Sequence, residues 1–213
     1  MHNNKEHYGP HGTKRDEWRR DFSLDDPLDW GLAIPDNIKQ KDIPTELLQI
    51  FSRFYHEGLI QRYGGSCVIM ANLLRRILRL HGIEAFSRQT IFQYENRNKG
   101  WKVQTGTDRD IVPEGKVDVH MVCVSQGFVL DFAQTPLHQQ YGMQAPICFI
   151  GLDDPNSYNG PMQNFGKYGV ANWHVKRPKN DFVRHILYNN RELILKETKE
   201  YFYRYKMKPY LDD

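Results

Sequence analysis

Apolar side chains recur at helical spacing in two stretches of the N-terminal half of the chain. The first stretch predicts a helix over about 44–57, which Gly58 would end. The second begins at Ser66 or Cys67 and stops at Gly82, a residue type that commonly follows a helix. Its apolar stripe comprises Val68, Ile69, Leu73, Leu74, Ile77, Leu78 and Leu80. A stripe this wide predicts a largely buried helix.

Short apolar runs in the middle of the chain predict β-strands. The run Ser125-Gln126-Gly127 separates two of them and predicts a tight turn, so these two strands should form a hairpin. Residues 95–116 hold Gly and Pro and predict either a long loop or a ragged hairpin that contains Trp101-Lys102-Val103. The predicted strands cover residues 83–94, 117–124, 128–133 and 147–150.

The remaining segments differ in composition. Residues 1–20 are rich in His, Lys, Arg and Gly and predict a flexible tail, which leaves 21–213 as a single domain. Residues 151–180 are rich in Asn, Pro, Gly and aromatic residues and predict a long loop or a lid over a site. A pattern rich in Glu, Lys and Tyr over 181–205 predicts a final helix.

Composition narrows the class of protein. The chain has 213 residues, of which 39% are hydrophobic and 13% aromatic, and this is typical of a globular domain. The formal net charge of +3 comes from basic residues spread along the chain, so nucleic acid is not an expected partner. Three cysteines form no zinc spacing and favour a reducing compartment. Because the sequence shows neither a signal peptide nor a run of about 18 apolar residues, we expect a cytoplasmic protein with no membrane, metal or cofactor requirement.

Cys67 is the first candidate for chemistry. A thiol on the first turn of a helix faces the positive end of the helix dipole, which favours the thiolate, and the free N–H groups of that turn can bind a developing oxyanion. Gly65 and Ser66 would form the approach for a substrate carbonyl. Gln61 could donate to the same oxyanion as the Cys67 N–H, or it could be an exposed residue at a helix end. The alternative for Cys67 is a small buried core residue.

His120 and Asp131 are the candidate partners of the thiol. A turn at Ser125-Gln126 would place them directly opposite each other in the hairpin, and a turn at Gln126-Gly127 would place them diagonally. In both cases the two side chains share a face, so the carboxylate can orient the imidazole. Asp118 has the same parity as His120 and is the alternative orienting residue.

Two further groups of side chains are assigned to packing or solvent. Cys123 has the opposite parity to His120 and is expected in the core, as is Cys148. The basic residues of the second helix are expected to point outward as a solvated face, and they are Arg75, Arg76 and Arg79.

With Cys67, His120 and Asp131 in this chain order, residues 58–135 resemble the papain and transglutaminase-like superfamily. Gln61-x-x-x-Gly65-Ser66-Cys67 is similar to the oxyanion Gln and Gly-Ser-Cys of papain-like peptidases. The run Gly64-Gly65-Ser66-Cys67 followed by Asn72-x-Leu74 resembles the Cys helix of arylamine N-acetyltransferases. The aromatic residue that usually follows a papain-like Cys is Val68 here, and the third triad residue is Asp rather than Asn.

The resemblance implies an α+β fold in which a Cys-bearing helix packs on a small antiparallel sheet, here with extra N- and C-terminal helices. It implies acyl transfer or amide hydrolysis through a Cys67 thioester, with His120 and Asp131 completing a triad. The substrate would be a protein or peptide amide, and aromatic residues such as Trp173 could form its walls. Two alternatives stay open: a small-molecule acyltransferase similar to arylamine N-acetyltransferases, which would use a small acyl donor, and a non-catalytic interaction module.

Overall fold

The computed structural model describes residues 31–106, 119–142, 145–154, 162–175 and 181–205. The expected tail at 1–20 lies outside these residues, and the assignment of one domain stays a prediction. Within the described residues the fold is α+β. The helices are α1 (Thr45–His56), α2 (Leu59–Tyr63), α3 (Cys67–Leu80), α4 (Thr135–Tyr141), α5 (Asp181–Asn189) and α6 (Arg191–Tyr205). The strands are β1 (Leu32–Ala33), β2 (Phe86–Asn96), β3 (Trp101–Thr105), β4 (His120–Ser125), β5 (Phe128–Asp131), β6 (Cys148–Leu152), β7 (Gln163–Asn164) and β8 (Val170–Val175).

The two helices expected in the N-terminal half are both present, as α1 and α3. The apolar stripe of α3 is buried as predicted, except for Leu80, which is 41% exposed in the last turn. The short helix α2, between them, was not predicted. It starts after Gly58, whose φ of 68° is in the left-handed region that glycine tolerates.

The strands form one sheet in the order β1-β6-β5-β4-β2-β8-β7, and β3 also pairs with β2. All pairs are antiparallel except β1 with β6. Residues 95–116 contain the predicted ragged hairpin, since β3 pairs with the end of β2. Residues 151–180 are not only a loop or lid, because they supply β7 and β8 to the sheet.

The predicted C-terminal helix is two helices, separated at Asn190. The Asn190 side chain donates to the Ile186 carbonyl at 2.9 Å, so its amide bonds to the end of α5. Asparagine side chains often compete with the backbone in this way, which explains a break inside an otherwise helical pattern. The break lets α6 turn and pack along α3.

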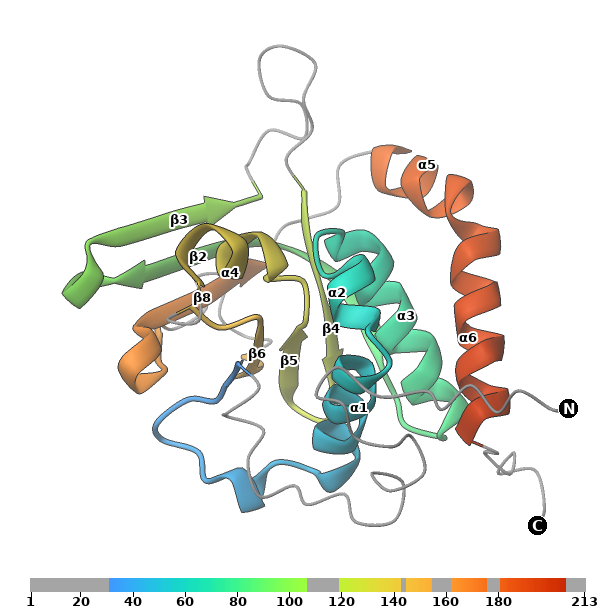
Figure 1. The fold of residues 1–213 in the computed structure, drawn as a ribbon, viewed down its shortest axis with the longest axis horizontal. Coiled ribbons are helices and arrows are strands. Elements are labelled where there is room, and N and C mark those ends of the chain that lie inside the picture. Colours follow the sequence, from blue (N-terminus) through green and yellow to red (C-terminus); the bar gives the residue numbers. More distant parts are fainter. Residues whose placement is uncertain (1–30, 107–118, 143–144, 155–161, 176–180, 206–213) are drawn as a thin grey trace, which may run out of the picture.

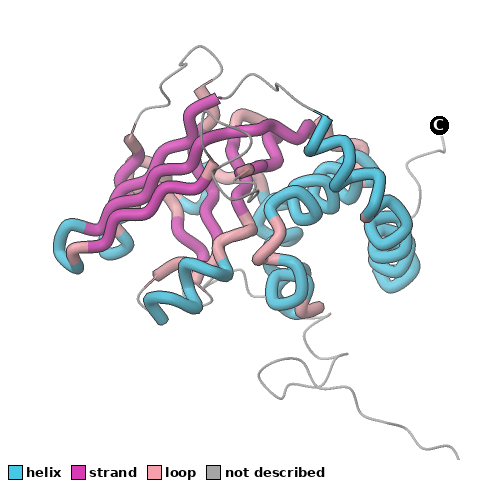
Figure 2. Tube along the Cα trace, turned by 90° about the horizontal axis from the view of Figure 1, so that it is seen from above, coloured by secondary structure: helices cyan, strands magenta, loops and turns pink. Residues whose placement is uncertain are grey.

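The helices α1, α2, α3 and α6 lie together on one side of the sheet, and β2, β3 and β8 extend away from them (Figure 1). Viewed from above, the strands lie mainly on one side and the longer helices on the other, with short helical segments also at the outer ends of the strands (Figure 2). The main core lies between these helices and the sheet and contains Cys123 and Cys148, both 0% exposed, as predicted. A second cluster covers the other face of the sheet and includes Phe92, Phe149 and Trp173. No helix in the described part of the chain is long and apolar enough to span a membrane.

Candidate active site

Cys67 is the first residue of α3, as the sequence predicts. Its side chain is half-buried, and its Sγ donates to the carbonyl of Val119 at 3.1 Å. Because Cys67 opens the helix, its backbone N–H has no acceptor within α3. The thiol and a free N–H donor are therefore present on the same residue.

Gly64 sets how closely the turn before Cys67 approaches α4. The Thr135 N–H donates to the Gly64 carbonyl at 3.3 Å, and the Thr135 hydroxyl donates to the Ile60 carbonyl at 3.2 Å. A Cβ at position 64 would overlap the Thr135 hydroxyl and the Ile60 carbonyl. At Gly65, by contrast, a Cβ would meet no atom within 4 Å. The two glycines thus differ: the first is required for packing, and the second faces open space.

The hairpin that carries the two partners turns at Gln126-Gly127. Both residues have positive φ, 52° and 79°, and the register pairs Ser125 with Phe128. Of the two expected turns, this is the one that makes His120 and Asp131 diagonal neighbours on a shared face. Asp118, the alternative orienting residue, lies outside the described residues.

His120 and Asp131 form a buried hydrogen-bonded pair. His120 Nε2 lies 2.7 Å from Asp131 Oδ2, and the two side chains are 4% and 0% exposed. The His120 ring packs against Phe92, with ring centroids 5.3 Å apart. Gly106 packs so close to His120 that a Cβ there would lie 3.2 Å from the His120 Cβ. Phe92 therefore packs against the imidazole ring, and Gly106 packs against the Cβ and main chain of His120.

Asp131 is surrounded by hydrogen-bond donors. Its Oδ2 also accepts from Gln134 Nε2 and Trp173 Nε1, each at 2.8 Å, and its Oδ1 accepts from the Ala133 N–H at 3.3 Å. Burial opposes the charge, but the charge and hydrogen bond of His120, with the bonds from Trp173 and Gln134, lower the pKa of Asp131 below its usual value. Asp131 is thus a stable buried carboxylate.

This carboxylate changes the protonation of His120. Burial lowers the pKa of His120, but the charge of Asp131, its hydrogen bond, and a side-chain hydrogen bond and charge interaction with Cys67 outweigh burial and raise it to about 10. Since Nε2 faces Asp131, the second ring nitrogen, Nδ1, is left for the thiol. The structure therefore brings Cys67, His120 and Asp131 together as the sequence predicts, with His120 between the other two.

A pocket of about 230 Å³ opens beside Cys67 and His120. Gly65 lines it, while the other walls come from β3, Val119 and the segment that begins α4. Apart from His120 and Cys67, the described residues that line it are uncharged, and they are Gly65, Val103, Thr105, Val119, Ala133, Gln134, Pro136, Leu137 and Gln140. The Thr105 hydroxyl is buried without a hydrogen-bond partner among the described residues. The lining therefore suits an uncharged group.

Three expected site residues lie outside the lining of this pocket. Gln61 is exposed on α2, which agrees with the alternative of an exposed residue and leaves the Cys67 N–H as the donor at the pocket. Ser66 precedes α3 and makes no side-chain capping bond. Trp173 is 5% exposed on β8 and is a donor to Asp131 rather than a substrate wall.

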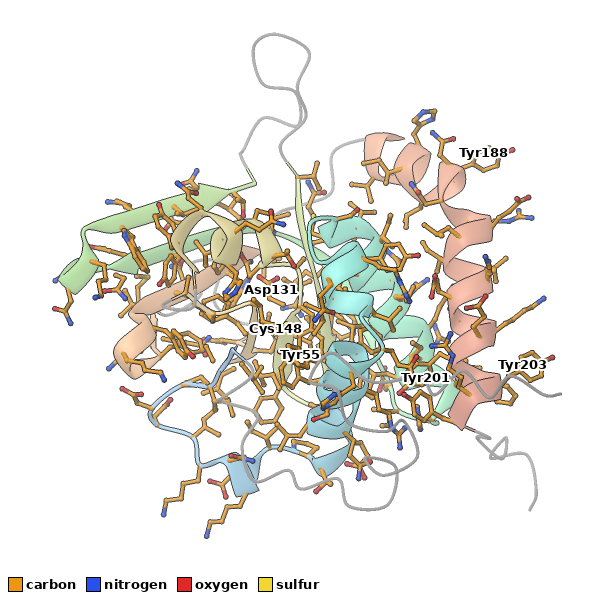
Figure 3. All side chains as sticks on the ribbon, in the orientation of Figure 1. Tyr55, Asp131, Cys148, Tyr188, Tyr201 and Tyr203 are labelled. Atoms are coloured by element: carbon orange, nitrogen blue, oxygen red, sulfur yellow. The ribbon has the colours of Figure 1, made fainter. Side chains whose placement is uncertain are left out.

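The sequence reasoning missed Gln134 and the true role of Trp173. Gln134 lies three residues after Asp131, a spacing that could have suggested a contact between the two side chains. Trp173 carries no such signal, because it reaches Asp131 from β8, 42 residues further along the chain. Figure 3 shows Asp131 inside the molecule, close to the sheet.

No group of three or more His, Cys, Asp or Glu side chains in the described part of the chain is arranged to hold a metal ion. The arrangement instead presents a thiol and an imidazole beside one small pocket, with a carboxylate bonded to the imidazole and a helix-start N–H on the thiol residue. Chemically it can form and break an acyl bond to sulfur.

Comparison with known proteins adds little to this geometry. No protein-family model matches the chain, and no curated protein matches it. A crystal structure described only as a genomics target aligns with 76% of this chain and 77% of its own, at 16% sequence identity and a TM-score of 0.45. A likeness this distant carries no argument about activity.

Proposed function

We propose that this protein is a cysteine-dependent enzyme that transfers or hydrolyses acyl groups through a thioester on Cys67. The observation that carries the proposal is the buried pair of His120 and Asp131, with Nε2 and Oδ2 2.7 Å apart, and the position of Cys67 beside His120 in the lining of one pocket. A buried carboxylate that orients an imidazole beside a thiol is the arrangement that activates a nucleophilic cysteine.

The papain and transglutaminase-like superfamily is the proposed family. Its support is the combination of a Cys residue at the start of α3, packing of α3 on β4, and an antiparallel hairpin that carries His120 and Asp131. The chain order of the three residues is also the one expected for that superfamily.

The mechanism begins with a protonated His120. A pKa of about 10 makes His120 basic enough to take the proton of the Cys67 thiol and to hold it as the imidazolium near neutral pH. The sulfur attacks the carbonyl carbon, the C–S bond forms, and the electron pair of the C=O bond moves to oxygen. The Cys67 N–H donates to this oxyanion at the positive end of α3.

Collapse of the tetrahedral intermediate releases the leaving group. The C–N bond of the amide breaks, His120 gives its proton to the leaving nitrogen, and a thioester remains on Cys67. An acceptor then loses a proton to His120 and attacks the thioester carbonyl, which frees the sulfur. Water as acceptor yields a carboxylic acid, and an amine yields a new amide.

The size and chemistry of the pocket support a protein or peptide amide as the acyl donor. A volume of about 230 Å³ suits one side chain or a small acyl group rather than an extended chain. Its uncharged walls include the side chains of Gln134 and Gln140, whose amides can bond to a neutral carboxamide. A small acyl donor fits the same volume and is the second candidate.

The proposal is tested by trapping the acyl-enzyme. The purified protein is incubated with p-nitrophenyl acetate or with a glutamine-containing peptide and an amine, and intact and peptide mass spectra are recorded. We expect an adduct on Cys67 that decays when water or amine attacks it. Cys67→Ala should form none, and His120→Gln should form it far more slowly. A folded protein with no Cys67 adduct from any acyl donor would indicate a non-catalytic interaction module instead.

A further inference from the structure

A second cavity, separate from the Cys67 pocket, lies where α3 meets α5 and α6. Its volume is about 230 Å³, and it shares no lining residue with the Cys67 pocket. Three arginines line it: Arg75 and Arg76 from α3, and Arg191 from the start of α6. No Asp or Glu is among its described lining residues. We call it the arginine pocket.

The three guanidinium groups have no acidic partner among the described residues, a property they share with Arg53 and Arg79. Four other arginines pair with carboxylates: Arg62 with Glu197, Arg88 with Asp153, Arg97 with Glu95 and Arg204 with Glu57. Within the described residues, Arg75, Arg76 and Arg191 form no such pair. Like charges held together without a counterion repel each other, so an anion bound among them would be favourable.

Arg75 gives a second sign that a partner is absent. Arg75 and Arg76 are half-buried, whereas Arg79 is exposed. The Nε of Arg75 is buried and has no hydrogen-bond acceptor among the described residues. A buried unpaired donor is costly, and a ligand oxygen that the guanidinium can turn toward would remove this cost.

The surroundings favour the same kind of ligand. Arg191 begins α6, so the positive end of that helix dipole adds to the charge of the pocket. Ile194 is buried and supplies an apolar wall. Tyr188, 75% exposed, lies at the outer end of α5 and offers an aromatic face (Figure 3).

We propose that the arginine pocket binds a phosphate group carried by a small molecule. A phosphate monoester presents three terminal oxygens and close to two charges, enough for Arg75, Arg76 and Arg191 together, whereas a carboxylate presents two oxygens and one charge. The rest of the ligand would pack against Tyr188 and Ile194. This inference does not depend on the acyl-transfer proposal.

Isothermal titration calorimetry with phenyl phosphate tests this site, because the probe combines a phosphate monoester with an aromatic ring. We expect binding that weakens as salt increases. Arg75→Gln, Arg76→Gln and Arg191→Gln should each weaken it by about tenfold, the usual effect of losing one charge-assisted hydrogen bond. Arg79→Gln is the matched control, since it removes the same charge from an exposed position on α3 outside the pocket.

Four further comparisons make the result decisive. Thermal melting by circular dichroism shows that each variant is folded. Benzoate should bind at least tenfold more weakly than phenyl phosphate, and Cys67→Ala should bind both probes as the wild type does. Binding only to phosphatidylcholine vesicles that contain a phosphoinositide, lost in the same three variants, would identify the phosphate as a lipid headgroup. The proposal would be overturned if the protein bound neither phenyl phosphate nor the vesicles. It would also be overturned if Arg79→Gln weakened binding as much as the three pocket variants, or if benzoate bound as tightly as phenyl phosphate.

Discussion

His120 Nε2 and Asp131 Oδ2 lie 2.7 Å apart although the two residues are not directly opposite in the β4–β5 hairpin. The register places them diagonally, and the length of the imidazole closes the remaining gap. The turn at Gln126-Gly127 therefore leaves the pair intact, and the carboxylate still fixes which ring nitrogen faces Cys67.

Iodoacetamide should label Cys67 much faster than the other two cysteines near neutral pH. Cys123 and Cys148 are 0% exposed, and burial raises the pKa of Cys123 to about 12 and that of Cys148 well above its usual value. Peptide mass spectrometry over time measures the three rates in one sample. His120→Gln should slow only the labelling of Cys67. Equal, slow labelling of all three thiols would contradict an activated nucleophile.

Asp131→Asn should remove most activity and also destabilise the fold. The variant loses the charge beside the His120 imidazolium, and one amide orientation would set an NH₂ group against the donors of Gln134 and Trp173. Breaking a buried ion pair in this way costs about 3–5 kcal/mol. Urea unfolding measures the loss of free energy, and the rate of acyl-enzyme formation measures the loss of activity. Asp153→Asn, which breaks the ion pair with Arg88, is the control; it should leave the rate unchanged.

Trp173→Phe should lower the rate of acylation without a large change in substrate binding. The phenyl ring keeps most of the packing but removes the N–H that donates to Asp131 at 2.8 Å. A hydrogen bond to a charged group contributes about 1.5–3 kcal/mol, so a loss of roughly tenfold to a hundredfold in kcat is expected. KM should change little, because Trp173 lies outside the pocket lining. Trp101→Phe, which alters a ring stacked on Tyr141, should leave kcat as it is.

The stability of the protein should decrease as the pH rises above about 6.5. Below the ordinary pKa of 6.5, both folded and unfolded chains hold the His120 proton, and the stabilisation is complete. Between 6.5 and about 10 only the folded protein keeps this proton, so the free energy of unfolding falls as the pH rises. For Asp131, whose folded pKa is lowered from 3.8, stabilisation is present above that value and is lost as the pH falls.

Urea unfolding of wild type and His120→Gln at several pH values from 6 to 9 checks this prediction. The difference in free energy of unfolding between the two proteins should shrink steadily as the pH rises. A difference that stays constant over this range would show that folding does not raise the pKa of His120.

Gly64→Ala and Gly65→Ala should have opposite consequences. The first places a methyl group against Thr135 and the Ile60 carbonyl, so it should destabilise the fold by about 1–3 kcal/mol, a typical cost of overpacking. The second points a methyl group into open space at the Cys67 pocket and should leave stability nearly unchanged while it slows acylation by bulky donors. Thermal melting and acylation rates with small and large acyl donors separate the two effects. Similar melting temperatures for the two variants would contradict the assigned role of Gly64.

Part of the candidate site follows from the sequence alone because its geometry is local. Strand side chains alternate with a period of two, so both possible turns between β4 and β5 put His120 and Asp131 on one face. A helix has a fixed rise and twist, so the Gly-Gly-Ser-Cys run and the apolar stripe after it are enough to put Cys67 at a helix start. The opposite parity of Cys123 likewise determined that it lies in the core.

Only the tertiary structure decided what surrounds this local geometry. The contact of Trp173 with Asp131 requires β8 to pair with β2, and the arginine pocket requires α5 and α6 to fold back onto α3. Gln61 is near Cys67 in sequence, yet the unpredicted helix α2 directs it to the surface. Contacts between distant segments depend on the combined burial of many side chains and on the cost of loop closure. A short sequence pattern therefore does not predict them.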